Sequence, residues 1–284
     1  MNRIVVVTDS TSNFPPELGD GYAIPTIPLV VHWGEQAYLD GVTLDTKTFY
    51  RWLSERKDSP TTSQPSAGEF MEFFQQVAEQ SQTNTILGIF VSSELSGTLA
   101  SATQARAELP DLNIELVDSR SISMGLGFQV LAAKRAVQEG LDLDAILARV
   151  QRVRASMQLI FTVDTLEFLH RGGRIGGAAR LLGTALNLKP VLTLESGKVE
   201  ALEKVRSRRK SLQRVVEIAE KRLAGRRPAE LAILQTEADE DLTYMVELVN
   251  QQLKPEKLCA CVLTPVVGTH AGPGALGVAF YTED

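Results

Sequence analysis

The segment from Ile86 to Ala102 constrains the fold of this chain more than any other part of its sequence. An apolar run of strand length, Ile86–Val91, ends in the serines Ser92 and Ser93, and a helix-forming segment opens at Ser96-Gly97-Thr98. Ligands of an open α/β sheet bind at the carboxyl ends of its strands, and a helix N-terminus favours an anion. Because the segment holds no Cys, Lys or His, it predicts a cradle for a small anionic group rather than a catalytic centre. The alternative is a serine-rich loop that only caps a helix.

Strand-like runs alternate with helical patterns in the first half of the chain. Ile4–Val7 is entirely β-branched, as in a strand buried on both faces, and it leads into Asp9-Ser10. Ile114–Val117 leads in the same way into Asp118-Ser119. This alternation predicts a parallel sheet with helices on both faces. The polar ends of its strands, stacked side by side, would form one polar rim.

A hydroxyl-rich segment, Thr61–Ser66, precedes another helical pattern in the same half. Ser66 and Glu69 have the spacing of a capping box, so we expect the hydroxyls to lie on a loop that enters the helix. The apolar run Ile24–Trp33 is interrupted by two prolines. It therefore predicts an edge strand or an extended segment.

The pattern changes near Ser156, after which strands and helices no longer alternate regularly. We expect strands at 159–163, 190–194, 198–202, 231–234, 258–263 and 278–281, with 190–202 forming a hairpin, and helices near 178–186, 212–223 and 239–253. A chain of 284 residues is expected to form two domains. We predict an α/β protein with an N-terminal α/β domain, residues 1–156, and a C-terminal α+β domain, residues 157–284.

Charge and hydropathy exclude several classes of function. A formal net charge of −6 argues against bulk affinity for nucleic acid or anionic membranes. No apolar run approaches the roughly 20 residues of a membrane-spanning helix, and no signal-peptide pattern opens the sequence. The only cysteines, Cys259 and Cys261, would share one face of a strand without further metal ligands. We therefore expect reduced core thiols and a cytoplasmic protein.

The polar segment Thr264–Gly277 is expected to be a loop around His270. Its G-x-G-x-x-G pattern is not a dinucleotide fingerprint, because that motif opens a helix and needs an acid about 20 residues later, where this sequence has already stopped. His270 is either a functional group between domains or a structural histidine. With Ser92 or Ser93 and with Asp9 or Asp118 it could form a hydrolase triad, although the G-x-S-x-G elbow is absent.

Two arginine-bearing segments stand out in the second half of the chain. The glycine-rich run that ends at Gly177 contains Arg171 and Arg174, and it is either a phosphate-binding loop or a flexible surface turn. The basic run Arg206–Lys210 is either the solvated start of a helix or a docking patch for an acidic partner.

Taken together and in order, these motifs resemble the DegV family over nearly the whole chain. The matching motifs are Thr8-Asp9-Ser10, Thr62-Ser63-Gln64-Pro65-Ser66, Ser92-Ser93-Glu94-Leu95-Ser96-Gly97-Thr98, Val117-Asp118-Ser119, Leu166-Glu167-Phe168-Leu169, Arg171-Gly172-Gly173-Arg174-Ile175, Lys189-Pro190-Val191-Leu192 and His270-Ala271-Gly272-Pro273-Gly274-Ala275. The resemblance implies a cytoplasmic bacterial protein with two α/β domains that hold a long-chain fatty acid between them. It also implies that a separate fatty acid kinase catalytic subunit receives the bound acid and uses ATP to make acyl phosphate. No metal, cofactor or catalytic residue of this chain is implied.

The resemblance also assigns roles to individual residues. Thr62 and Ser93 would bind the carboxylate, and His270 would complete the network from the second domain. Supporting contacts are expected from Ser63, Ser96, Gly97, Thr98 and Thr269. Arg174 and Arg206 would lie outside the pocket and dock the kinase subunit, whereas Arg171 stands where many members carry a lysine. Apart from the resemblance, burial of an acyl tail requires a dry tunnel, for which the apolar residues around Ile122, Met124, Leu126 and Phe128 are candidates.

Two other classes of function remain open from the sequence. A free-standing acyl-ester or thioester hydrolase would use Ser93 and His270. A lipid-sensing regulator, or a binder of another small anion, would need no kinase partner.

Overall fold

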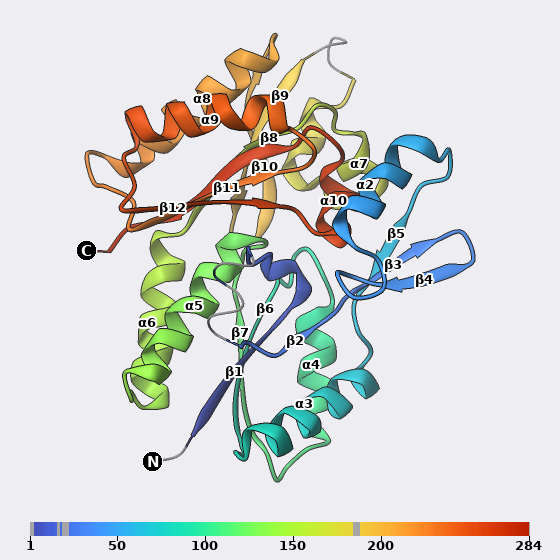
Figure 1. Ribbon diagram of the computed structural model, residues 1–284, viewed down its shortest axis with the longest axis vertical. Helices are drawn as coiled ribbons and strands as arrows, with labels where there is room; N and C mark the ends of the chain where they lie inside the picture. Colours follow the sequence, from blue (N-terminus) through green and yellow to red (C-terminus); the bar gives the residue numbers. More distant parts are fainter. Residues whose placement is uncertain (1–2, 16–17, 19–22, 184–187, 284) are drawn as a thin grey trace.

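A parallel sheet forms the core of the first half of the chain, and Figure 1 shows it in the lower part of the molecule. The computed structural model describes residues 3–15, 18, 23–183 and 188–283. The sheet order is β2-β1-β6-β7, with bounds β1 (Ile4–Asp9), β2 (Thr26–Ile27), β6 (Thr85–Phe90) and β7 (Asn113–Asp118). Every pairing is parallel. The predicted polar rim is confirmed, since Val91 N–H donates to Asp9 across the strand ends at 2.8 Å.

Helices cover both faces of this sheet, as the sequence predicts. They are α3 (Ala67–Ser81), α4 (Thr98–Ala107), α5 (Met124–Gln138) and α6 (Leu143–Ser156). Val5 and Val7 pack with residues of α3 and α4, whereas Val6 between them packs with residues of α5 and α6. The β-branched run is therefore buried on both sides because successive strand residues face opposite helix layers. The capping box of Ser66 and Glu69 begins α3.

A six-stranded mixed sheet forms the second half and lies above the first in Figure 1. Its order is β10-β9-β8-β13-β11-β12, with bounds β8 (Gln158–Thr162), β9 (Lys189–Glu195), β10 (Lys198–Val205), β11 (Glu230–Gln235), β12 (Lys257–Val262) and β13 (Leu276–Tyr281). The predicted β9–β10 hairpin is confirmed. Helices α8 (Arg208–Leu223) and α9 (Asp239–Gln252) pack on one face. Helix α5 packs on the other face, through Met124 and Phe128, so it contacts both sheets.

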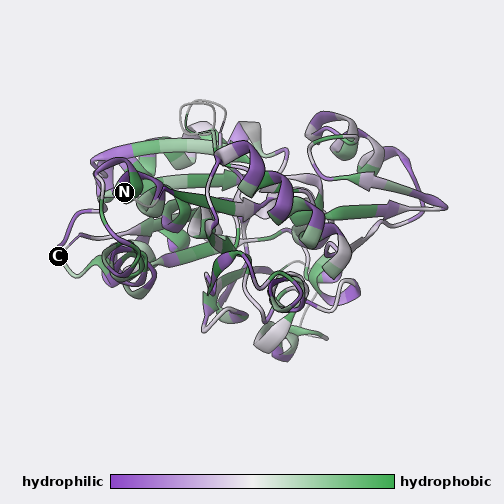
Figure 2. Cartoon of the chain, turned by 90° about the horizontal axis from the view of Figure 1, so that it is seen from below, coloured by the Kyte–Doolittle hydropathy of each residue, from purple (hydrophilic) through white to green (hydrophobic). Residues whose placement is uncertain are grey.

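The contacts of α5 with both sheets bear on the predicted domains. The mixed sheet begins at Gln158, directly after α6 ends at Ser156. Helix α5 belongs to the first half of the chain, yet it contributes side chains to a core shared with the mixed sheet. The predicted boundary between two domains at residue 156 therefore stays a prediction. Figure 2 shows the strands of the sheets mainly in hydrophobic colours and the helices in mixed colours, as expected where sheets form the centre of the molecule.

A third sheet, which the sequence analysis did not predict, stands at the right of Figures 1 and 2. It is antiparallel in the order β4-β3-β5 and is accompanied by α2; the bounds are β3 (Val30–Trp33), β4 (Gln36–Leu39), β5 (Thr61–Ser63) and α2 (Thr46–Glu55). The expectation of a loop at Thr61–Ser66 is therefore wrong for its first three residues. A strand of three polar residues has no hydrophobic pattern of its own, and only its pairing with β3 makes it a strand.

The segment Thr264–Gly277 also differs from the expectation of a loop. Its residues Pro265–Ala271 form helix α10, with proline in the first turn, where its missing N–H costs nothing. A short helix α7 (Glu167–Arg171) and two 3₁₀ helices, η1 (Ser10–Ser12) and η2 (Gly176–Leu181), complete the described elements. Of the helix expected at 178–186, residues up to 181 are 3₁₀, and residues 184–187 lie outside the described part of the chain.

The two cysteines follow the prediction. Both belong to β12, Cys261 is buried and Cys259 half-buried, and neither forms a disulfide. No helix within the described residues is long and apolar enough to span a bilayer.

Candidate functional site

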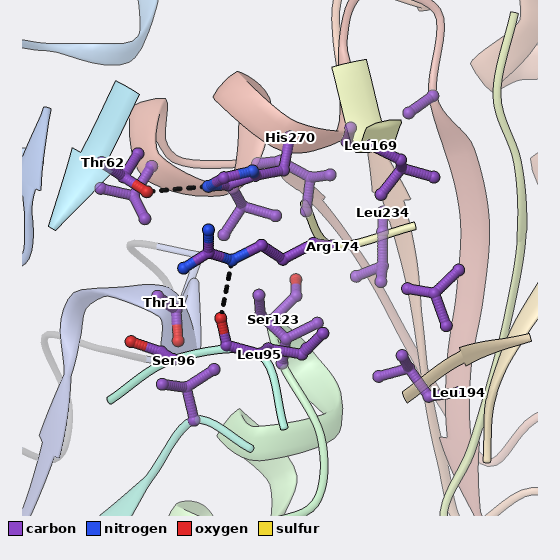
Figure 3. Close-up of a pocket in the computed structure, with 18 of the residues that line it drawn as sticks. Thr11, Thr62, Leu95, Ser96, Ser123, Leu169, Arg174, Leu194, Leu234 and His270 are labelled. Atoms are coloured by element: carbon purple, nitrogen blue, oxygen red, sulfur yellow. Dashed lines mark hydrogen bonds between the residues drawn. The ribbon is translucent and has the colours of Figure 1, made fainter. Parts of the chain in front are cut away.

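A cavity lies between the parallel sheet, the mixed sheet and α10. Most of its lining is apolar and comes from both halves of the chain, for example Leu95, Ile122, Phe161, Leu194, Leu234 and Leu276. Five of the polar residues labelled in Figure 3 lie on one side, namely Thr11, Thr62, Ser96, Arg174 and His270, and Ser123 lies nearer the middle. The leucines Leu169, Leu194 and Leu234 lie on the other side. The cavity therefore has one polar end and one apolar end.

Thr62 and His270 meet at the polar end. Thr62 Oγ1 and His270 Nε2 share a hydrogen bond of 2.8 Å, although 208 positions separate them in sequence. Thr62 is held by the pairing of β5 with β3, and His270 lies in the last turn of α10. The third sheet and α2 also fix α10, because Tyr50 donates to Leu263 O at 3.0 Å and Asp40 accepts from Val266 N–H at 3.1 Å.

A glycine allows the imidazole to lie where it does. A Cβ at position 172 would collide with Nδ1 of His270, so only glycine fits there while the ring keeps its place. This glycine is the first of the run that the sequence analysis described as either a phosphate-binding loop or a flexible turn. In the structure Gly172 instead packs closely against the imidazole of His270.

Burial, and then the positive charge of Arg174, lowers the pKa of His270 from its usual 6.5 to about 4. The imidazole is therefore neutral at pH 7. Its Nδ1 is buried and has no hydrogen-bond partner among the described residues. A neutral ring presents one donor and one acceptor, so it suits a hydrogen-bond network better than an ion pair.

Arg174 lines the cavity, and its predicted position outside the pocket is wrong. Its Nε donates to Leu95 O at 2.9 Å and its Nη1 to Gly172 O at 2.6 Å. Figure 3 shows the guanidinium between His270 and Ser96. None of the described carboxylates forms an ion pair with it, so it supplies a positive charge at the polar end. The sequence could not reveal this, because the direction of the side chain depends on carbonyls that are distant in sequence.

Ser93 is not among the lining residues, and its side chain is engaged elsewhere. Its hydroxyl donates to Asp118 Oδ2 at 2.6 Å, while Ser92 donates to Gly197 O at 2.9 Å. In a hydrolase triad the serine hydroxyl donates to the histidine, and the carboxylate accepts from that histidine. Here Ser93 bonds directly to the carboxylate and His270 bonds to Thr62, which is not a triad. The role of Ser93 in binding a carboxylate stays a prediction.

The five supporting residues divide between the cavity and its surroundings. Ser63 and Ser96 line the cavity. Ser96 shares a hydrogen bond of 2.8 Å with Thr98, which is buried at the start of α4. Gly97 lies against the amide of Gln64, and Thr269 donates to Pro265 O within α10 at 2.8 Å.

Some lining residues were missed or misplaced by the sequence analysis. Thr11, Gln64 and Ser123 line the cavity; the only signal for Thr11 was its place directly after the strand-end motif Thr8-Asp9-Ser10, and the only signal for Gln64 was its place in the motif Thr62–Ser66. Of the four tunnel candidates, Ile122 lines the cavity. The other three, Met124, Leu126 and Phe128, are instead buried in the packing of α5 against the two sheets.

The two remaining arginines lie outside the cavity. Arg206 is exposed directly before Ser207, whose side chain caps α8, so the basic run begins a helix. Arg171 forms an ion pair with Glu167 one turn earlier in α7. Among the described residues no group of three or more His, Cys, Asp or Glu side chains could hold a metal ion.

The fold and the site define an α/β protein with an internal ligand cavity that is polar at one end and apolar elsewhere. The chain belongs to the DegV family, since a family model described as "Uncharacterised protein, DegV family" matches residues 3–283. A DegV domain-containing protein of Deinococcus radiodurans is 37% identical over 276 residues, which cover 97% of each chain.

Two solved structures share the whole fold. The first is described as "Fatty Acid Binding of a DegV family Protein from Thermus thermophilus"; it is 35% identical, with a TM-score of 0.92 over 99% of this chain and 100% of that one. The second, of DegV from Bacillus subtilis, is described as a fatty acid binding protein. It is 30% identical, with a TM-score of 0.87 over the whole of both chains. The family resemblance and the fold class drawn from the sequence are thereby confirmed.

Proposed function

We propose that this protein binds a long-chain fatty acid, with the carboxylate at the polar end of the cavity and the acyl chain along its leucines. One observation carries the proposal. A guanidinium, an imidazole and hydroxyls gather at one end of a cavity whose remaining lining is mostly apolar. That distribution matches a molecule with one anionic head and a long hydrocarbon tail.

The apolar lining accounts for the affinity. Burial of an acyl chain contributes about 0.8 kcal/mol per methylene, partly offset by the ordering of a flexible tail. An anionic head that leaves water must be fully hydrogen-bonded. Thr62, Ser96 and His270 supply hydrogen-bonding groups, and Arg174 supplies the opposite charge. The fatty-acid binding described for the Thermus thermophilus and Bacillus subtilis proteins supports this assignment.

The second part of the proposal is that the bound acid is presented to a separate fatty acid kinase catalytic subunit in the cytoplasm. The family resemblance of the motifs supports it. Arg206 is the docking residue in this proposal, because it is exposed and lies outside the cavity. Arg174 instead holds the carboxylate at the place where a phosphate donor would have to approach.

Mass spectrometry after denaturing extraction tests the binding. The protein should release a long-chain fatty acid in near-stoichiometric amount. Recovery of only a polar metabolite would overturn the proposal. The loaded protein is then incubated with ATP, with and without a kinase subunit. Acyl phosphate, trapped as the hydroxamate, should form only with both present.

The same purified protein can be used to test two alternative functions. A hydrolase would turn over a chromogenic acyl ester, and Ser93→Ala would abolish that activity. The bond from Ser93 to Asp118 weighs against this alternative. A lipid-sensing regulator would bind fatty acid but give no acyl phosphate with any kinase subunit.

A further inference from the structure

A second cleft lies behind the apolar wall of the fatty-acid cavity. Leu159 and Leu194 line both spaces, so the two share a wall. Apart from these leucines, Ala155 and Met157, the lining of the second cleft is polar and includes Arg120, Arg154 and Ser196. Three elements form it: the segment after β7, the last turn of α6 and the turn of the β9–β10 hairpin.

The cleft is positively charged. Two arginines line it, and no lining residue carries a carboxylate. Within the described ranges neither Arg120 nor Arg154 forms an ion pair, in contrast to Arg149 one turn earlier in α6, which pairs with Glu139. A concentration of unneutralised guanidinium groups is unexpected in a chain with a net charge of −6. Such a site costs stability through charge repulsion unless an anion neutralises it.

Both arginines are anchored to the same residue, Asp118. Arg154 Nη1 donates to the carbonyl oxygen of Asp118 at 2.9 Å. The backbone N–H of Arg120 donates to the carboxylate of Asp118 at 2.8 Å, and Arg120 has a left-handed φ of 49°. Few residues other than glycine adopt that conformation, so the backbone at position 120 is specifically shaped beside the cleft.

The hairpin turn closes the cleft from the opposite side. Ser92 donates to Gly197 O at 2.9 Å, which fixes the turn that presents Ser196 against the parallel sheet. The polar groups of the cleft therefore come from three separate segments of the chain. A planar carboxylate has two oxygens, whereas a tetrahedral phosphoryl group offers three or more and can contact more of these groups at once.

We propose that this cleft binds a phosphate-class anion, either free phosphate or the phosphoryl group of a nucleotide, through Arg120 and Arg154. The site is separate from the proposed fatty-acid carboxylate site, since only the two leucines are common to both. The inference does not depend on the fatty-acid proposal, and its test uses protein with whatever lipid it carries.

Calorimetric titration with inorganic phosphate and, separately, with ATP tests the inference at constant ionic strength. The most informative variant is Arg120→Gly, because glycine accepts the left-handed backbone and removes only the side chain. Its affinity for the anion should fall at least tenfold. Arg106→Ala is the matched control, since Arg106 is an exposed arginine at the end of α4 and does not line the cleft, and this variant should bind as the parent does.

Binding of both probes would identify phosphate itself as the ligand, and binding of ATP alone would identify the phosphoryl group of a nucleotide. Either result supports the inference if Arg120→Gly weakens that binding at least tenfold and Arg106→Ala does not. No binding of either probe at millimolar concentration would overturn it. Equal weakening in Arg120→Gly and Arg106→Ala would also overturn it, because the attraction would then reflect overall charge and not the cleft.

Discussion

Thr62 Oγ1 lies 2.8 Å from Nε2 of His270, and this contact joins the third sheet to α10 across the polar end of the cavity. The two residues come from opposite ends of the chain and from elements with separate hydrogen-bond patterns. The two are brought together because α2 and the residue after β4 hold the start of α10, through Tyr50 and Asp40, so the site exists only while the third sheet and α2 are packed on α10. Removal of either side chain leaves the other without this partner.

Thr62→Ala should weaken fatty-acid binding by about 1.5–3 kcal/mol, the range for a hydrogen bond to a charged group. Thr62→Ser should retain most of the affinity, because it keeps the hydroxyl. Thr61→Ala is the control on the same strand, since Thr61 is exposed. Isothermal titration with delipidated protein measures all three, and equal affinity of Thr62→Ala and the parent would remove Thr62 from the head-group site.

Ser93→Ala tests the role that the family resemblance assigns to Ser93. Its hydroxyl donates to Asp118 in the structure. The variant will lose affinity only if that hydroxyl leaves Asp118 for the carboxylate when fatty acid binds. Ser96→Ala is the comparison, because Ser96 already lines the cavity, and we expect it to weaken binding by about 1 kcal/mol or more.

Arg174→Ala and Arg206→Ala should behave differently. Arg174 lines the cavity, so its removal should reduce the affinity for fatty acid about tenfold or more, as expected when an anion loses a charged partner. Arg206 is exposed outside the cavity, so its variant should bind normally and form acyl phosphate more slowly with the kinase subunit. Normal fatty-acid affinity in Arg174→Ala would show that the charge of Arg174 does not contribute to fatty-acid binding.

Fatty acid should raise the pKa of His270. In the structure that pKa is lowered to about 4 by burial and by Arg174. A bound carboxylate favours the protonated ring and neutralises the effect of Arg174. NMR titration of the three histidines, with His270→Gln to assign the resonance, measures the pKa with and without ligand. An unchanged pKa would place the carboxylate elsewhere.

Asp40→Asn should stabilise the protein above pH 6. Burial raises the pKa of the Asp40 carboxyl to about 6, so the folded state holds a proton that the unfolded state loses near pH 4. Stability contributed by Asp40 therefore falls as pH rises from about 4 to about 6. The asparagine variant lacks that fall and can still accept from Val266 N–H. Its unfolding free energy should exceed that of the parent by about 1–3 kcal/mol at pH 7.5, and the excess should shrink toward pH 4 in urea titrations. A constant difference across this range would contradict the assignment.

Gly172→Ala should displace the imidazole of His270, because the new Cβ would occupy the place of Nδ1. The backbone at position 172 has φ −75°, so no conformational strain confuses the result. Affinity for fatty acid should fall at least tenfold while the fold persists by circular dichroism. Gly68→Ala, whose nearest neighbour would be Ser66 Oγ at 3.9 Å, is the matched control and should bind normally.

Local sequence predicted much of the scaffold. The capping box at Ser66 and the hairpin at 190–202 depend on interactions between near neighbours, and the strand at Ile4–Val7 shows itself in a local β-branched pattern; all three are confirmed. The third sheet was missed for the opposite reason. Its strand β5 contains three polar residues and owes its conformation to pairing with β3, about thirty positions earlier in the chain.

The sequence by itself determined the alternation of strands and helices, the polar ends of the parallel strands and the set of motifs that place this chain in the DegV family. The tertiary structure alone decided which of those polar groups face the cavity. Arg174 turned inward because the carbonyls of Leu95 and Gly172 accept its N–H groups, and Ser93 turned away because Asp118 accepts its hydroxyl. Each of these choices depends on partners brought close by packing, and residue type and spacing along a chain do not record where such partners will lie.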